Sequence, residues 1–258
     1  MFSGERLDVL RRYADSVKTY RSISPASPYF RSARLRIAAS LANIDRNDEA
    51  VKILKEMIKE RPISVDVAIA LGDILRINNR FEESIEYYDL AIDQIKTIES
   101  WHWSLYYSRG IVLERTNRWP LAEEDFLKAL ELKPDQPLVL NYLGYSWVEQ
   151  GTNLQRAMVL IKRAVTLRPT DGYIVDSLGW AFYRLELYEE AVKYLERAII
   201  LRPEDPIITD HLGDIYWHVG RRVEAKFQWE RALTLGADDE AASIIRQKLK
   251  NGIPNLDE

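Results

Sequence analysis

The chain has 258 residues, of which 47% are hydrophobic and 29% charged, and its formal net charge is −4. This balance is ordinary for a helix-rich globular chain and disfavours a general nucleic-acid binder, which usually carries a strongly basic face. Cysteine is absent, which excludes disulfides, thiolate metal sites and cysteine nucleophiles. No apolar run approaches 18 residues and the first residues do not read as a signal peptide, so the sequence predicts no insertion of this chain into a membrane.

A pattern of about 34 residues recurs along the chain and is clearest between residues 137 and 236. Each unit opens with a Leu-Gly pair, has an aromatic residue three positions after the glycine, and then carries two alanines seven residues apart. Small residues at these positions let two helices approach closely, so each unit is predicted to be a pair of antiparallel helices that stacks on its neighbours. The predicted packing positions are Gly72, Gly110, Gly144, Gly179, Gly213, Ala122, Ala157, Ala191 and Ala225.

The same spacing extends towards the N-terminus with weaker matches, and it predicts about seven units. Their expected bounds are 1–28, 31–62, 65–96, 103–134, 137–169, 172–203 and 206–237, followed by a capping helix over 238–251 and a tail over 252–258. Gly4 takes the eighth position of the first unit, so a chain that starts inside a helix is expected to be a fragment of a longer repeat protein. A short native chain with a frayed first helix is the alternative.

The third and fourth units are separated by four extra residues, about one helical turn, followed by Trp101-His102-Trp103. One interpretation is a local change of pitch that presents both tryptophans to a partner. The other, which is favoured, is a longer helix whose tryptophans pack between repeats. Further along, Gly151 and Gly220 are expected to supply left-handed turn conformations.

The sequence holds little that could carry chemistry. Of the three histidines, His102, His211 and His218, none belongs to a set with metal-ligand spacing. Asp210, Asp214 and His218 follow each other at four-residue intervals, but a solvated or peptide-contacting helix face is favoured over a metal site. No phosphate-binding loop, nucleophile elbow or paired acid motif is present, so neither enzyme activity nor a cofactor is expected.

Together, the Leu-Gly pairs, the aromatics, the alanines, and the prolines that close two units at Pro169 and Pro203 resemble the tetratricopeptide repeat (TPR) family. The resemblance implies an all-α, right-handed superhelical solenoid of antiparallel helix pairs. It also implies a groove that binds protein or peptide partners through positions 2, 5, 9 and 12 of each first helix. The candidate partner-binding residues are Tyr107, Asn141, Tyr145, Tyr173, Asp176, Trp180, Tyr183, Asp210, Asp214 and Trp217, and the same positions also hold Leu138 and Ile207.

The chemistry of these residues favours some partners over others. The acids at 176, 210 and 214 would repel a carboxylate, which disfavours the clamp that holds acidic chaperone C-termini. An aromatic groove with carboxylates suits an extended segment with apolar and basic side chains, or a partner's helix. The alternative is that several of the aromatics pack within the superhelix and leave only the carboxylates facing water.

Residues 137–236 also resemble the C-terminal repeats of large proteobacterial envelope TPR lipoproteins, which act as adaptors for carboxyl-terminal processing proteases. The resembling runs are Asn141–Tyr145, Asp171–Trp180 and Asp210–Asp214. The resemblance implies a bacterial scaffold in the periplasm or tethered to the outer membrane, with the cytoplasm as the alternative. Three functions stay open: an adaptor, a self-assembling module that forms a homodimer, and the regulatory region of a longer enzyme.

Overall fold

The computed structural model describes residues 2–60 and 62–253, and these residues form helices and turns with no β-strand. The chain divides into two compact units, Met1–Lys133 and Pro134–Glu258, which we describe one at a time. The predicted all-α fold is confirmed. None of the helices in the described ranges combines the length and the apolar character needed to cross a membrane.

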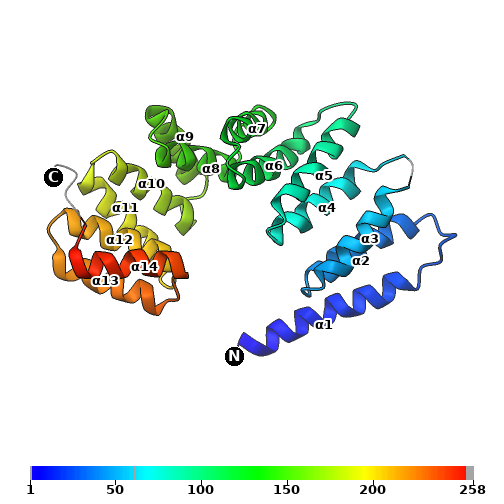
Figure 1. Cartoon of the computed structure of the whole chain (residues 1–258), viewed down its shortest axis with the longest axis horizontal. Coiled ribbons are helices and arrows are strands. Elements are labelled where there is room, and N and C mark those ends of the chain that lie inside the picture. The colour runs from blue at the N-terminus through cyan, green and yellow to red at the C-terminus, as the bar shows by residue number, and fades with distance from the viewer. Residues whose placement is uncertain (1, 61, 254–258) are drawn as a thin grey trace. The chain divides into compact units, whose positions relative to one another are not determined.

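The first unit contains seven α-helices and one short 3-10 helix within its described residues (Figure 1). They are α1 (Phe2–Arg21), α2 (Phe30–Ala42), α3 (Asn47–Ile58), α4 (Val65–Ile77), α5 (Phe81–Gln94), η1 (Ser100–His102), α6 (Trp103–Arg115) and α7 (Trp119–Leu132). The second unit contains α8 (Pro137–Glu149), α9 (Leu154–Leu167), α10 (Gly172–Arg184), α11 (Tyr188–Leu201), α12 (Pro206–His218), α13 (Arg222–Thr234) and α14 (Asp239–Asn251).

Consecutive helices from α2 to α13 pack as pairs, and each pair contacts the next pair within its unit. Where the two helices of a pair cross, a Cβ atom added to the glycine of the first helix would lie 2.4–2.7 Å from a large side chain of the second. The glycine and large-residue pairs are Gly72 with Tyr88, Gly110 with Phe126, Gly144 with Ile161, Gly179 with Leu195, and Gly213 with Trp229. The missing side chain therefore makes room for a large side chain of the second helix in each pair.

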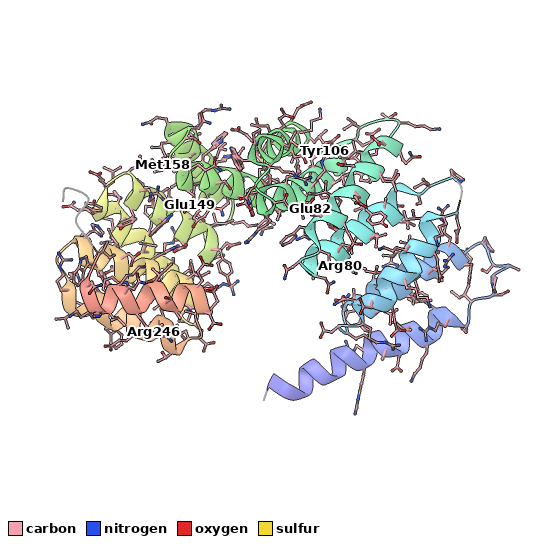
Figure 2. The ribbon with its side chains drawn as sticks, viewed as in Figure 1. Arg80, Glu82, Tyr106, Glu149, Met158 and Arg246 are labelled. Atoms are coloured by element: carbon pink, nitrogen blue, oxygen red, sulfur yellow. The ribbon has the colours of Figure 1, made fainter. Side chains whose placement is uncertain are left out.

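The second helices contribute alanines to the same interfaces. Ala122, Ala157, Ala191 and Ala225 are all fully buried. The helices nevertheless keep a buried and an exposed side, as the side chains in Figure 2 show: Met158 on α9 is buried, whereas Glu149 at the end of α8 is exposed. Each unit thus has a continuous core made by stacking, as expected for a chain whose repeats contact only their neighbours.

The first expected helix pair is absent, which corrects the interpretation of residues 1–28. Residues 2–21 form one continuous helix, α1, which packs on α2. The turn between the helices of a pair should lie near Arg11, and nothing in that stretch favours a left-handed backbone. The helix therefore continues through it.

The segment between α5 and α6 also differs from the favoured interpretation. Helix α5 ends at Gln94, and the extra residues form an irregular connection followed by η1, not a longer helix. Trp101 is 54% exposed and its ring lies tilted against the buried imidazole of His102, with 3.6 Å between the ring centroids. The Glu99 backbone N–H donates to His102 Nδ1 at 2.8 Å, so the buried ring at this connection is the histidine, whereas Trp103 is half-buried near Tyr107.

A left-handed residue recurs in the turn inside every pair from α2 to α13. These residues are Asp45, Asn79, Asn117, Gly151 with Asn153, Glu186 and Gly220. The expectation for Gly151 and Gly220 is confirmed by φ values of 65° and 81°. Glu186, with φ of 60°, stands out because glutamate gains nothing from this conformation.

Replacing Glu186 by glycine should raise the free energy of unfolding by about 1 kcal/mol. The left-handed conformation costs an ordinary residue roughly 1–2 kcal/mol. Glycine avoids this cost but loses more backbone entropy on folding, so only part of it is gained as stability. Urea unfolding followed by circular dichroism measures the change. The matched control is Gly220→Ala, which should lower stability by about the same amount, and a loss of stability in Glu186→Gly would contradict the prediction.

Candidate functional site

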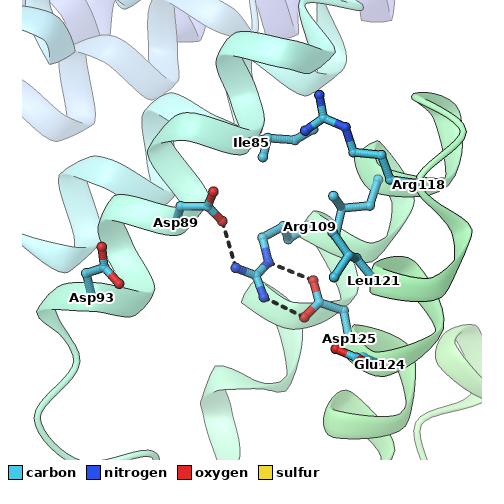
Figure 3. Close-up of a pocket in the computed structure, with 9 residues that line it drawn as sticks. Ile85, Asp89, Asp93, Arg109, Arg118, Leu121, Glu124 and Asp125 are labelled. Atoms are coloured by element: carbon cyan, nitrogen blue, oxygen red, sulfur yellow. Dashed lines mark hydrogen bonds and ion pairs between the residues drawn. The ribbon is translucent and has the colours of Figure 1, made fainter.

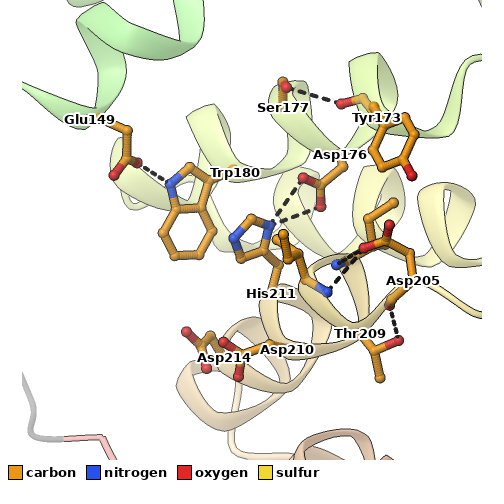
Figure 4. Close-up of polar contacts among 12 residues, drawn as sticks. Glu149, Tyr173, Asp176, Ser177, Trp180, Asp205, Thr209, Asp210, His211 and Asp214 are labelled. Atoms are coloured by element: carbon orange, nitrogen blue, oxygen red, sulfur yellow. Dashed lines mark hydrogen bonds and ion pairs between the residues drawn. The ribbon is translucent and has the colours of Figure 1, made fainter. Parts of the chain in front are cut away.

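The first helices of the second unit are joined by a ladder of polar side chains. Helices α8, α10 and α12 lie side by side, since α10 contacts both of the others. Asn141 Nδ2 donates to Ser177 Oγ at 3.1 Å, which joins α8 to α10. One repeat further, His211 Nδ1 on α12 lies 3.0 and 3.1 Å from the two carboxylate oxygens of Asp176 on α10 (Figure 4).

The last rung of this ladder is an ion pair between α12 and α14. Lys248 Nζ lies 2.8 Å from Asp210 Oδ2 and 2.8 Å from Asp214 Oδ2. The other oxygen of Asp214 accepts a hydrogen bond from Trp229 Nε1 at 2.8 Å. Two carboxylates thus share one ammonium group, and Asp214 is only 5% exposed. Burial, and then the neighbouring Asp210 charge, raise the pKa of Asp214 to about 6 despite Lys248.

An aromatic cluster lies beside the ladder. The Trp180 ring stacks on His211 and on Tyr183, with centroid separations of 4.1 and 4.7 Å. The Trp180 indole N–H donates to Glu149 Oε1 at 2.5 Å, and the Tyr183 hydroxyl lies 3.3 Å from His218 Nδ1. Burial, and then neighbouring carboxylates, raise the pKa of the Tyr183 hydroxyl above its usual range. The cluster is therefore held by contacts within the unit.

Large apolar side chains stay exposed at one repeated position of the same helices. Leu138, Tyr173 and Ile207 occupy the second residue of α8, α10 and α12 and are 38%, 51% and 59% exposed. We call these three residues the apolar stripe. Arg202 lies over the Tyr173 ring, with its Cζ 4.9 Å from the centroid. Asp171 and Asp205 accept hydrogen bonds from the first backbone N–H groups of α10 and α12, so the helix starts that carry Tyr173 and Ile207 are held in place.

Helix α14 covers the groove positions of the last pair. Besides the Lys248 ion pairs, the Trp217 indole N–H donates to the Ile253 carbonyl at 3.1 Å, and the Gly252 backbone lies against the Trp217 ring. Asp210, Asp214 and Trp217 therefore contact the C-terminal segment instead of facing an open groove. The expected tail over 252–258 begins with these two packed residues, Gly252 and Ile253, and its remaining residues lie outside the described ones.

The remaining candidates are placed as follows. Asp176 is buried in its contact with His211, whereas Asn141, Tyr145, Trp180 and Tyr183 are half-buried along α8 and α10. Tyr107 belongs to the first unit, where its ring lies 6.1 Å from Trp103 and 6.2 Å from Phe126. Nine of the ten candidates thus lie in the second unit, and Tyr173 is the most exposed of them.

The comparisons with known proteins agree with the fold. A family model described as tetratricopeptide repeat matches residues 35–97, 107–172 and 177–242. The chain belongs to the tetratricopeptide repeat family. It is 27% identical over 182 residues, 70% of its own length, to the TPR repeat-containing protein PA4667 of Pseudomonas aeruginosa, and it spans about 30% of the length of that relative.

Two solved structures show the same fold. The APC/C hetero-tetramer Cut9–Hcn1 matches with a TM-score of 0.76 and 18% identity over 98% of this chain and 47% of the other. YrrB, described as a TPR protein with an unusual peptide-binding site, matches with a TM-score of 0.55 and 20% identity over 76% of this chain and 99% of the other. The TPR fold is typical of protein-interaction scaffolds, which are generally not enzymes.

In this TPR protein the sequence pattern predicted one residue of each ladder contact and missed its partner. Glu149, Ser177 and His211 are partners of predicted groove residues, and each lies next to or near a groove position of an adjacent repeat. Pairing position 5 of one repeat with position 6 of the next would have predicted two of these partners, Ser177 and His211. Lys248 lies outside the repeats, so no periodic signal pointed to it.

No metal centre emerges from the described part of the chain, which contains no group of three histidine or acidic residues suited to hold an ion. Asp210 and Asp214 turn towards the Lys248 ammonium, and His218 Nδ1 lies 3.0 Å from the Asp214 carbonyl oxygen. The four-residue spacing of these three side chains therefore reflects packing between α12, α10 and α14.

The stability of the second unit should fall as the pH rises from about 4 to 8. Burial alone would lower the pKa of His211, but the Asp176 carboxylate raises it above 6.5, and the pKa of Asp214 is raised from 3.8 to about 6. Both groups have a higher pKa in the folded state than in the unfolded state. Each group's contribution to stability is therefore complete below its pKa in the unfolded state and is lost as the pH rises through its pKa in the folded state. The contribution of Asp214 to the free energy of unfolding that is lost in this way is on the order of 2–3 kcal/mol.

Urea unfolding followed by tryptophan fluorescence at several pH values measures this dependence. Asp214→Asn should flatten the fall between about pH 4 and 6, and His211→Gln should flatten the part above pH 6.5, where the histidine contribution is lost. A stability that increases over this range, or an unchanged slope in both variants, would contradict the assignment.

Proposed function

We propose that the chain is a non-enzymatic adaptor that binds an extended segment of a partner protein along the apolar stripe. The observation that carries the proposal is the repeated exposure of Leu138, Tyr173 and Ile207 at the same position of three adjacent helices. Large apolar side chains of this kind, aligned on one face, are typical of interaction surfaces. The polar side chains beside the stripe already bond to one another. The stripe is therefore expected to bind a partner mainly through apolar contacts.

The spacing of the stripe selects the conformation of the partner. Adjacent packed helices are about 8–10 Å apart, so successive stripe residues are separated by roughly that distance. A polyproline II segment advances about 3.1 Å per residue and returns to the same face every third residue, a step of about 9 Å. A segment with large apolar side chains at every third residue would therefore place one on each helix.

The stripe can be tested by substitution because its residues are exposed. The triple variant Leu138→Ala, Tyr173→Ala, Ile207→Ala removes the surface with little expected cost in stability. The matched control is Val159→Ala, Ile200→Ala, Val223→Ala, which truncates three residues that are 66%, 78% and 81% exposed on the second helices. Asp176 is unsuitable as a probe because its removal leaves His211 buried without its partner.

Cross-linked capture from envelope and cytoplasmic fractions of the source organism is the experiment. We expect the wild type and the control to retain the same partner and the stripe variant to lose it. Equal capture by the stripe variant would rule out this surface. If light scattering shows the wild type to be dimeric and only the chain itself is captured, the homodimer takes precedence over the adaptor.

A more specific role follows from the resemblance of residues 137–236 to envelope adaptors. We propose that the partner is a carboxyl-terminal processing protease of the bacterial periplasm, or a substrate that the chain presents to it. The similarity to a Pseudomonas aeruginosa TPR repeat-containing protein supports a bacterial setting. Recovery of such a protease from the envelope fraction supports this role, whereas an exclusively cytoplasmic partner contradicts it.

A further inference from the structure

Helix α1 has the residue pattern of a second helix, but no first helix packs against it. Residues 13–23, in α1 and just after it, align without a gap with residues 81–91 of α5. The inward-facing residues matched in this way are Ser16 with Ser84, Val17 with Ile85, and Tyr20 with Tyr88. Helix α1 therefore keeps the register of a helix pair.

The positions of Ser16 and Tyr20 are fully buried in the second helices α3, α5, α7, α9, α11 and α13. The first position holds alanine in these helices, or serine in α5. The second position holds a large side chain, which is Leu54, Tyr88, Phe126, Ile161, Leu195 or Trp229. In α1 both residues are only half-buried. Since α2 does pack on α1, the uncovered side is the one that a first helix covers in the other pairs.

Hydrogen bonds in the α4–α5 pair show what a first helix supplies at these two positions. Ser84 Oγ on α5 donates to the Gly72 carbonyl at 2.8 Å. The Tyr88 hydroxyl donates to Asp73 Oδ1 at 2.7 Å. A glycine followed directly by an aspartate on the first helix therefore satisfies both hydroxyl groups of the second helix.

The next pair also joins its two helices by polar contacts at this crossing. Arg109 Nε and Nη2 on α6 each donate to the Asp125 carboxylate on α7 at 2.7 Å (Figure 3). Asp125 directly precedes Phe126, the residue that is equivalent to Tyr20. In the first unit, first and second helices are thus matched by a large side chain and by polar bonds beside it.

The uncovered face of α1 offers the groups that such a helix needs. Ser16 Oγ donates to the Arg12 carbonyl of its own helix at 2.9 Å, a bond that a side-chain rotation can exchange for one to a partner. Part of the Tyr20 ring packs on the core of the unit. Arg11 and Arg12 are exposed where an antiparallel helix docked at Ser16 would end, and cations stabilise the C-terminal end of a helix.

We propose that this face of α1 binds an amphipathic helix of a partner protein, one that has a glycine followed by an aspartate where it crosses Ser16 and Tyr20. A partner supplies the helix because residues 2–21 run past this face as one helix, without a turn that would lead the chain back along it. The first unit then has a binding surface of its own, separate from the apolar stripe of the second unit.

The probe for this surface is a fluorescein-labelled peptide with the sequence of residues 64–78, which contains α4, the first helix that pairs with α5. The control peptide carries Gly72→Leu, because a Cβ atom at this position would lie 2.6 Å from Tyr88 and should meet Tyr20 in the same way. Leucine also favours a helix more than glycine, so weaker binding would not reflect a loss of helix. Fluorescence anisotropy is measured as the full chain is added.

The chain is tested with one variant and one matched control. Ser16→Arg places a long side chain on the proposed surface. Ser22→Arg adds the same side chain at an exposed position, where the later second helices carry Arg163, Arg197 and Arg231. Circular dichroism shows whether both variants keep their helix content. The comparison of the two peptides uses the unmodified chain and so does not depend on the folding of either variant.

We expect the glycine peptide to bind with a dissociation constant below about 0.3 mM. The Gly72→Leu peptide and the Ser16→Arg chain should bind at least about tenfold more weakly, and Ser22→Arg within about twofold of the wild type. No saturation at about 1 mM chain, equal binding of the two peptides, or unchanged binding by Ser16→Arg would overturn the proposal. A dimer in light scattering that Ser16→Arg dissociates would also overturn it, because a second copy of the chain would then cover this face.

Discussion

Replacing Lys248 by methionine should destabilise the second unit by about 3–5 kcal/mol. Removing one partner of a buried ion pair leaves an uncompensated charge, and here a single ammonium serves both Asp210 and Asp214. Methionine keeps most of the apolar stem, so the loss comes mainly from the charge. Because Asp214 can be protonated, the loss should be smaller at pH 5 than at pH 8.

Hydrogen exchange of the α12 and α13 amides measures this effect directly, since repeat arrays need not unfold in one step. The control is Lys250→Met, two residues away on an exposed face of α14, where the change should stay within about 0.5 kcal/mol. Similar protection in both variants would show that the shared ammonium contributes little to the docking of α14.

Replacing Trp229 by alanine should cost about 3–5 kcal/mol in the same unit. The indole is fully buried, fills the space left by Gly213 and lies 5.3 Å from the Trp217 ring. The substitution leaves a cavity and also removes the N–H that donates to Asp214. Urea unfolding followed by the fluorescence of the remaining tryptophans measures the loss.

Trp229→Phe separates the two parts of this effect. Phenylalanine keeps most of the ring but cannot donate to Asp214, so its cost should be limited to about 1–3 kcal/mol. Gly213→Ala provides a second check, because the added Cβ would lie 2.4 Å from the indole and should therefore destabilise the wild type. If Gly213→Ala is stabilising, the close packing of this pair is not what selects the glycine.

The helix pairs could be predicted from the sequence because their signal is periodic and local. A glycine at one position requires a large residue where the second helix crosses it, and this rule applies to Gly144, Gly179 and Gly213 alike. The N-terminal caps at Asp171 and Asp205 are equally local, since each side chain bonds the next backbone N–H groups. Such features repeat with the period and can be found by alignment of the chain with itself.

The features that were missed depend on contacts without a period. The bond between Glu99 and His102 caps η1, after the irregular connection that replaces the expected continuation of α5, and this arrangement does not recur at the other repeats. The covering of Asp210, Asp214 and Trp217 depends on Lys248 and Ile253, which lie beyond the last repeat. Periodicity placed these three residues on the right helix face but could not show what lies against it.

The ladder of the second unit has a consequence for how such arrays can lengthen. Asp176 on α10 and Asp210 on α12 each present a carboxylate to the second helix after their own, where His211 and Lys248 each meet it with a nitrogen that can carry a proton. A duplicated copy of α12 and α13, placed after the original, would set a second histidine against Asp210 and return the last carboxylate to Lys248. Gene duplication within this region would therefore keep each Asp210 matched, whereas the buried Asp214 of the original copy would lose its ammonium and keep only the hydrogen bond from Trp229.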